Sequence, residues 1–85
     1  MLRNLKEIFR SQEDWPRLLA VMERLVVLLP DDMGERRDRG LVHAELGHAG
    51  QALADLQAYL EAEPLAADHG ALQARVKEIA GSAGL

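Results

Sequence analysis

Histidine is the residue type in this chain best suited to chemistry at neutral pH, and the chain has three: His43, His48 and His69. His43 and His48 are five residues apart, whereas two imidazoles share one helix face for metal binding at a spacing of four. Gly47 also interrupts any helix between them. We therefore expect His43 at the edge of a core, His48 in a turn, His69 exposed, and no metal site.

Nucleophiles and catalytic acids are equally sparse in this sequence. The chain has no cysteine, and its only serines, Ser11 and Ser82, fall in a turn and in the C-terminal tail. A serine in either place lacks the support that a Ser–His–acid arrangement needs. Acidic pairs such as Asp31 with Asp32 are best interpreted as helix caps or solvated charge. The sequence predicts no catalytic residue and no cofactor, so we do not expect an enzyme.

Arginines gather in two segments of a chain whose net charge is −4. The group is Arg3, Arg10, Arg36, Arg37 and Arg39. A guanidinium offers a planar fork that suits carboxylates, so one interpretation is a groove for an acidic or C-terminal peptide. The other interpretation is ordinary pairing with neighbouring Glu7, Glu35, Asp38 and Glu45 at helical spacing. The overall negative charge argues against nucleic-acid or membrane binding.

The elements that must position these residues all have the period of a helix. The first segment places Leu2, Leu5, Ile8 and Phe9 on one face. Stop and start signals then predict helices over about 15–29, 33–46, 49–62 and 67–80. Asp14 with Pro16 begins the second helix, Pro30 ends it, and Asp31 or Asp32 begins the third. Gly47 supplies a left-handed turn after that helix.

An internal repeat organises these helices. Pro30 and Pro64 are 34 residues apart, and the same shift places Leu19 on Leu53. Each unit is a pair of helices that buries its apolar face only by stacking on a neighbour. We therefore predict an all-α, right-handed stack of antiparallel helix pairs in a single domain. The predicted parts are repeat one at 1–30, repeat two at 31–64, a capping helix at 66–80 and a frayed tail at 81–85.

The period and its proline resemble the tetratricopeptide repeat (TPR), whose pattern is W-x2-L-G-x2-Y, then A-x3-F, then P. The second unit matches with Gly40, Ala52 and Pro64. Arg36, Arg39, His43 and Leu56 stand in its Trp, Leu, Tyr and Phe places. In the first unit Lys6 replaces the glycine. Gly40 and Ala52 are small where paired helices should cross closely.

The resemblance implies a protein–protein interaction module that uses the concave side of its stack. On that face we expect Arg3, Glu7, Arg10, Arg37, Leu41 and Glu45. The lysine–asparagine carboxylate clamp of some such proteins is not matched, because Glu7 and Asp38 stand where amides are needed. A second, apolar surface is expected at Leu2, Phe9, Val27 and Leu28, where the domain could form a homodimer or pack on an upstream domain.

A narrower resemblance lies in the asparagine-leucine-lysine start, "RDRG" and "ALADLQAYLE". These stretches look like the C-terminal repeat segment of bacterial SirB-type proteins with an upstream transglutaminase-like domain. This likeness implies a cytoplasmic protein of which the chain is a fragment, and the first helix begins without a capping residue. The rival to an interaction module is then a structural appendage that stabilises the upstream domain and self-associates when isolated.

Overall fold

In the computed structural model, residues 2–82 are described, with side chains from residue 4 to residue 81. The described residues form five α-helices and no strand. They are α1 (Leu2–Ser11), α2 (Trp15–Leu28), α3 (Met33–Glu45), α4 (Ala49–Ala62) and α5 (His69–Ser82). The predicted all-α class is confirmed, and none of these helices is long and apolar enough to cross a membrane.

Two aspartates begin helices as the sequence predicts. The Asp14 carboxylate accepts a hydrogen bond from the Arg17 amide at 3.4 Å, with Pro16 in the first turn of α2. Asp32, rather than Asp31, caps α3 and accepts from the Gly34 amide at 3.1 Å. Both caps satisfy backbone donors that a helix leaves unpaired at its first turn.

The turn between α3 and α4 depends on Gly47, which has a φ of +79°. The His48 amide donates to the His43 carbonyl at 2.8 Å, and the Gly47 amide donates to the Ala44 carbonyl at 3.2 Å. This pair of bonds is a Schellman motif, in which glycine adopts the left-handed conformation without a Cβ clash. The predicted role of Gly47 is confirmed.

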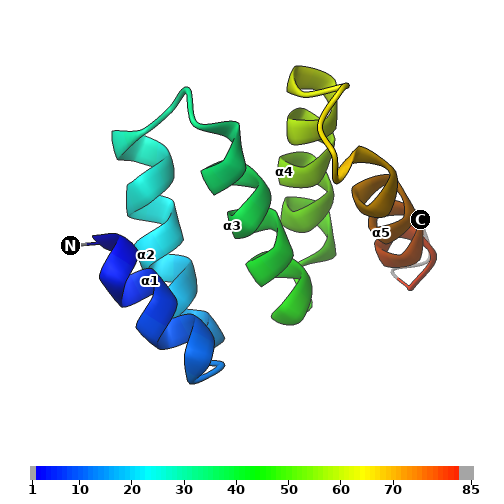
Figure 1. The fold of residues 1–85 in the computed structure, drawn as a ribbon. Helices are drawn as coiled ribbons and strands as arrows, with labels where there is room; N and C mark the ends of the chain where they lie inside the picture. The colour runs from blue at the N-terminus through cyan, green and yellow to red at the C-terminus, as the bar shows by residue number, and fades with distance from the viewer. Residues whose placement is uncertain (1, 83–85) are drawn as a thin grey trace.

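The helices follow one another across the molecule in chain order (Figure 1). Each helix packs mainly on its neighbours in the chain: α1 on α2, α2 on α3, α3 on α4, and α4 on α5. Two antiparallel pairs, α1 with α2 and α3 with α4, therefore stack side by side. Helix α5 packs against α4 of the second pair. This is the layered, nearest-neighbour packing of a helical repeat.

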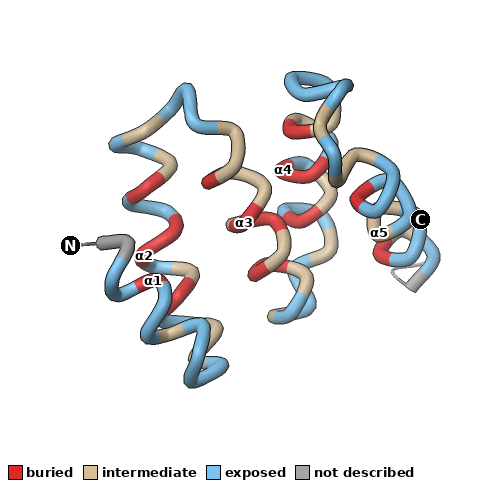
Figure 2. Tube along the Cα trace, viewed as in Figure 1, coloured by how far each residue is buried: buried red, intermediate tan, exposed pale blue. Residues whose placement is uncertain are grey.

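Two apolar clusters form the core, one on each side of α3 (Figure 2). The first contains Leu18, Val21, Met22, Leu25 and Val42. The second contains Ala52, Leu56, Tyr59, Leu72 and Ile79. Helix α3 is packed from two sides, because Val42 belongs to the first cluster while Leu41 and Ala44 pack against the second.

Gly40 sits where α3 and α4 approach each other most closely. A Cβ built on Gly40 would lie 2.9 Å from the Cβ of Asp55 and 3.1 Å from the Cγ of Leu56. Ala52 is fully buried on the facing helix. The small residues predicted to allow a close crossing are therefore where that crossing occurs.

The C-terminal helix is shifted relative to the prediction. It begins at His69, two residues later than expected, because Ala66 and His69 close a turn through the His69 amide and the Ala66 carbonyl at 3.1 Å. Gly81 and Ser82 were expected in the tail but are the last residues of α5. The rest of the predicted tail, residues 83–85, lies outside the described residues.

Candidate functional site

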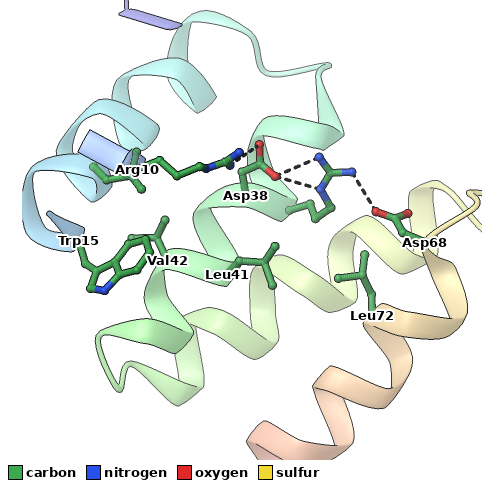
Figure 3. Close-up of a pocket in the computed structure, with 9 residues that line it drawn as sticks. Arg10, Trp15, Asp38, Leu41, Val42, Asp68 and Leu72 are labelled. Carbon is green, nitrogen blue, oxygen red and sulfur yellow. Dashed lines mark hydrogen bonds and ion pairs between the residues drawn. The ribbon is translucent and has the colours of Figure 1, made fainter. Parts of the chain in front are cut away.

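A groove of about 530 Å³ lies over α3, between the C-terminal end of α1 and the start of α5. Its walls come from α1, from α3, from the start of α5 and from the first turn of α2. Figure 3 shows the side chains that line it. They are Arg10, Trp15, Leu18, Arg37, Asp38, Leu41, Val42, Asp68 and Leu72.

One side of this groove is apolar. Trp15, Val42, Leu41 and Leu72 lie in a row along it (Figure 3). Leu72 and Val42 are buried in the two core clusters, while Trp15 is half-buried against the first cluster. The wall is therefore held rigid by the cores behind it. Such a wall can accept an apolar side chain of a bound segment.

The opposite side is a chain of charges centred on Arg37. Its Nε donates to Asp38 Oδ1 at 3.0 Å, and its Nη1 donates to Asp68 Oδ2 at 2.9 Å. The guanidinium carbon also lies 5.4 Å from the centre of the Tyr59 ring. Burial disfavours the charged form, but the field of Asp38 and these hydrogen bonds outweigh it and raise the pKa of Arg37. Arg37 thus joins α3 to the start of α5.

Asp68 completes that link between helices. The Tyr59 hydroxyl donates to Asp68 Oδ1 at 2.9 Å. This hydrogen bond, followed by that from Arg37, lowers the pKa of Asp68. Burial, followed by the bond to Asp68, raises the pKa of Tyr59, so its hydroxyl stays a neutral donor. Residues of α3 and α4 therefore fix the first turn of α5 against the groove.

Lys6 is bonded to Asp38, which lines the charged side of the groove. Although it stands in the glycine place of the first repeat, its side chain is buried. Its Nζ donates to Asp38 Oδ2 at 2.6 Å and to Glu35 Oε2 at 3.1 Å. Both carboxylates are also buried. A buried ammonium held by two buried carboxylates keeps these charges compensated as α1 packs near α3.

Arg10 is the cation of the groove with the loosest internal pairing. Its guanidinium lies 3.7 Å from Asp38 and 3.9 Å from Glu7, and about half of its side chain (49%) is exposed. Arg37, by contrast, makes short bonds in two directions. An incoming carboxylate could therefore engage Arg10 without breaking a short internal hydrogen bond.

The four of these arginines whose side chains are described do not form one cluster. Arg39 donates to both carboxylate oxygens of the buried Asp55 on α4, at 2.7 and 2.8 Å. Arg36 reaches the same carboxylate at 3.4 Å. These two side chains therefore pair with α4, away from the groove, and of the arginines with described side chains only Arg10 and Arg37 line it.

The other residues expected on the concave face are distributed as follows. Leu41 lines the groove. Glu7 is exposed beside Arg10, and Glu45 is 3.8 Å from Arg75 of α5. The side chain of Arg3 lies outside the described residues. Helical-spacing pairs therefore account for only part of the charge pairing, since most ion pairs connect different helices.

On the second expected surface, Val27 and Leu28 are exposed, at 77% and 64% of their surface. Phe9 is different: it is half-buried and packs against the first core cluster, because α1 folds back on α2. The expectation that Phe9 lacks cover is therefore corrected. The side chain of Leu2 lies outside the described residues.

Asp68 and Leu72 line the groove but were not anticipated as site residues. The signal was present, because the 34-residue shift from α3 leads to α5 and places Leu72 on Asp38. The C-terminal helix thus occupies the place of a third first helix. Because the sequence analysis predicted only a capping helix here, no groove residue was expected from α5.

The histidines hold a second feature that spacing alone did not predict. Nδ1 of His43 and Nδ1 of His48 are 3.0 Å apart, although the residues are five apart in sequence. A Schellman motif brings together the side chains at these two positions, so Gly47 was the signal. His43 is buried and His48 exposed, as expected, whereas His69 is half-buried rather than exposed. Among the described residues, no three potential ligands are placed to hold a metal ion.

Comparison with known proteins agrees with this architecture. A family model described as tetratricopeptide repeat matches residues 5–77. The chain belongs to the tetratricopeptide-repeat family. It is also similar to a "UPF0162 protein" of Xylella fastidiosa strain Temecula1, at 38% identity over 64 residues. A "UPF0162 protein" of strain 9a5c of the same species is 36% identical over 64 residues.

Each of these alignments covers 75% of this chain and 23% of the relative. The chain therefore spans about a quarter of the length of the curated relatives that it matches. Neither relative is named as SirB-type or transglutaminase-like, so the narrower resemblance stays a prediction. No solved structure matches the chain.

Proposed function

We propose that this TPR domain is a non-catalytic module that binds a peptide segment of another protein in the groove over α3. TPR domains generally mediate protein–protein interaction, and the groove offers what such a contact needs. Its apolar wall suits one aliphatic or aromatic side chain of the peptide. The observation that carries the proposal is the half-exposed, loosely paired Arg10 beside that wall.

The proposed ligand carries an acidic group close to an apolar side chain. Arg37 is already bonded to Asp38 and Asp68, so Arg10 is the cation that a peptide carboxylate would reach. A terminal carboxylate held by an amide clamp is disfavoured, because carboxylates occupy the amide positions at Glu7 and Asp38. An internal aspartate or glutamate suits this groove better.

Peptide display against the purified domain tests the proposal directly. We expect enriched sequences to pair an apolar residue with a nearby Asp or Glu. An Arg10→Gln variant should bind such a peptide about tenfold more weakly, since it loses one charge-assisted contact. Arg24→Gln is the matched control, because Arg24 lies outside the groove. Equal loss in both variants, or no enriched sequence, contradicts the proposal.

A second candidate function is supported by the exposed Val27 and Leu28. In this alternative the domain is a structural appendage that stabilises an upstream transglutaminase-like domain, as in SirB-type proteins, and self-associates alone. The greater length of the curated relatives supports it. Melting the longer protein with and without this domain tests it, since an appendage should raise the melting temperature of the rest. We propose the cytoplasm as the compartment, which the absence of cysteine suits.

A further inference from the structure

Helix α2 carries two stripes of residues, and only one of them faces the core. The inner stripe contains Leu18, Val21, Met22 and Leu25, all buried. The outer stripe contains Ala20, Glu23, Arg24, Val27 and Leu28, which together line a hollow of about 510 Å³. Their spacing of i, i+3, i+4, i+7 and i+8 is that of a helix face packed on another element.

This outer stripe continues onto α1. A smaller hollow of about 220 Å³ shares Ala20 and Arg24 with the first. It adds Leu5 and Phe9 of α1, together with Arg17 and Val21 of α2. No residue of the outer stripe lines the groove over α3. The stripe is thus separate from that groove, although Glu23 and Val27 also border a hollow lined by residues of α3 and α4. Its large aliphatic side chains, Val27 and Leu28, are exposed.

We propose that the outer stripe is the contact of an antiparallel homodimer, in which α2 packs on α2 of a second copy. The choice of a second copy rests on charge. Glu23 and Arg24 are adjacent, of opposite sign and exposed. Neither forms a hydrogen bond or ion pair with the described residues, although the field of Glu23 also acts on Arg39 and His43. A two-fold axis passing between them sets each opposite its complement on the other copy.

The same two-fold axis also places side chains of complementary size opposite each other. It places Ala20 of one copy opposite Val27 of the partner subunit, and the reverse contact follows by symmetry. A small residue facing a larger one lets two helices approach to the usual 8–10 Å. Apolar area would then be removed from water on both copies at once. A different partner whose surface carries charge of a single sign would pair with only one of the two residues Glu23 and Arg24.

Disulfide trapping tests this register, because the natural chain has no cysteine. An Ala20→Cys variant and a Val27→Cys variant are oxidised separately and as a mixture. We expect a covalent dimer chiefly in the mixture, since only that pairing brings the two thiols together. Strong cross-linking of either variant alone, or none in the mixture, overturns the antiparallel register.

Charge reversal tests the contact without a covalent bond. Glu23→Arg or Arg24→Glu alone should weaken dimerisation about tenfold in analytical ultracentrifugation, because each dimer contains two such contacts. The double variant Glu23→Arg with Arg24→Glu should recover it. Helix content by circular dichroism checks that all variants fold, and Arg10→Gln should leave dimerisation unchanged. A wild-type domain that is monomeric at all soluble concentrations overturns the proposal.

Discussion

At the scale of single residues, Gly40 shows how little space separates α3 from α4. The nearest atom to an added Cβ is the Cβ of Asp55 at 2.9 Å, which is close to the backbone and has little freedom to move. We expect Gly40→Ala to lower the free energy of unfolding by about 1–3 kcal/mol through overpacking, despite the better helix propensity of alanine. Gly40→Leu should cost more.

Urea denaturation of the two variants measures this effect. Gly50→Ala is a suitable control, because the added Cβ meets no atom within 4 Å beyond its chain neighbours and the adjacent backbone of its own helix. That substitution should leave stability unchanged or raise it slightly through helix propensity. A Gly40→Ala protein as stable as the wild type would show that the two helices can separate without cost.

His43 makes stability depend on pH. Burial is the largest cause that lowers its pKa, and His48 and Arg39 lower it further, while Asp55 of α4 and Glu23 of α2 oppose them. The unfolded chain therefore binds a proton at this histidine more readily than the folded chain does. Stability is fully present above the unfolded pKa of about 6.5 and should fall as the pH drops below it.

The change should be visible in melting temperatures measured on either side of that pKa. We expect His43→Gln to reduce the fall between about pH 7 and pH 5, because the unfolded chain takes up a proton at His43 there more readily than the folded chain does. His69→Gln serves as a histidine-removal control at the start of α5. If the wild type and His43→Gln lose stability in parallel across this range, His43 is not the group responsible.

At the scale of elements, ion pairs from Lys6 to Glu35 and Asp38 hold α1 near α3. Lys6 stands where the repeat pattern has a glycine, so the sequence did not indicate this role. Lys6→Met should lower the free energy of unfolding by about 3 kcal/mol, because Glu35 and Asp38 would stay buried without their shared ammonium. Lys77→Met is the matched control, since Lys77 is exposed on α5. Chemical denaturation of both variants gives the comparison, and similar stability in the two would contradict the role of Lys6.

Helix positions could be predicted from sequence because their signals are local. Asp14, Pro30 and Gly47 each act on the backbone within a few residues, so α2, α3 and α4 begin and end close to where they were expected. The inward faces of α2 and α4 follow from helical period alone. The start of α5 was placed about two residues too early, although Asp68, directly before His69, is a residue type that commonly begins a helix.

Contacts between elements were harder to predict, because charge partners depend on how helices stack. Helical spacing alone pairs Arg39 with a carboxylate of α3, yet the carboxylate that Arg39 binds is Asp55 on α4. Lys6 occupies a glycine place and nevertheless has a buried side chain. The side chains that line the groove come from several helices, and periodicity identified only Arg10, Arg37 and Leu41 among them.

At the scale of the whole molecule, the two core clusters meet only across α3, which predicts unequal local stability. Leu72→Ala removes a buried side chain from the second cluster and Met22→Ala removes one from the first. Each should cost about 2–5 kcal/mol, but the loss should be felt mainly by helices that share the altered cluster. Leu72→Ala should therefore reduce amide-exchange protection in α4 and α5 more than in α1 and α2.

Native-state hydrogen exchange of both variants distinguishes this behaviour from a single cooperative unit. Met22→Ala should show the reverse pattern, with α1 and α2 losing more protection than α5. Helix α3 should respond to both, because Val42 belongs to the first cluster while Leu41 and Ala44 pack on the second. Uniform loss of protection across all helices in both variants would mean that the 34-residue repeats unfold together rather than one by one.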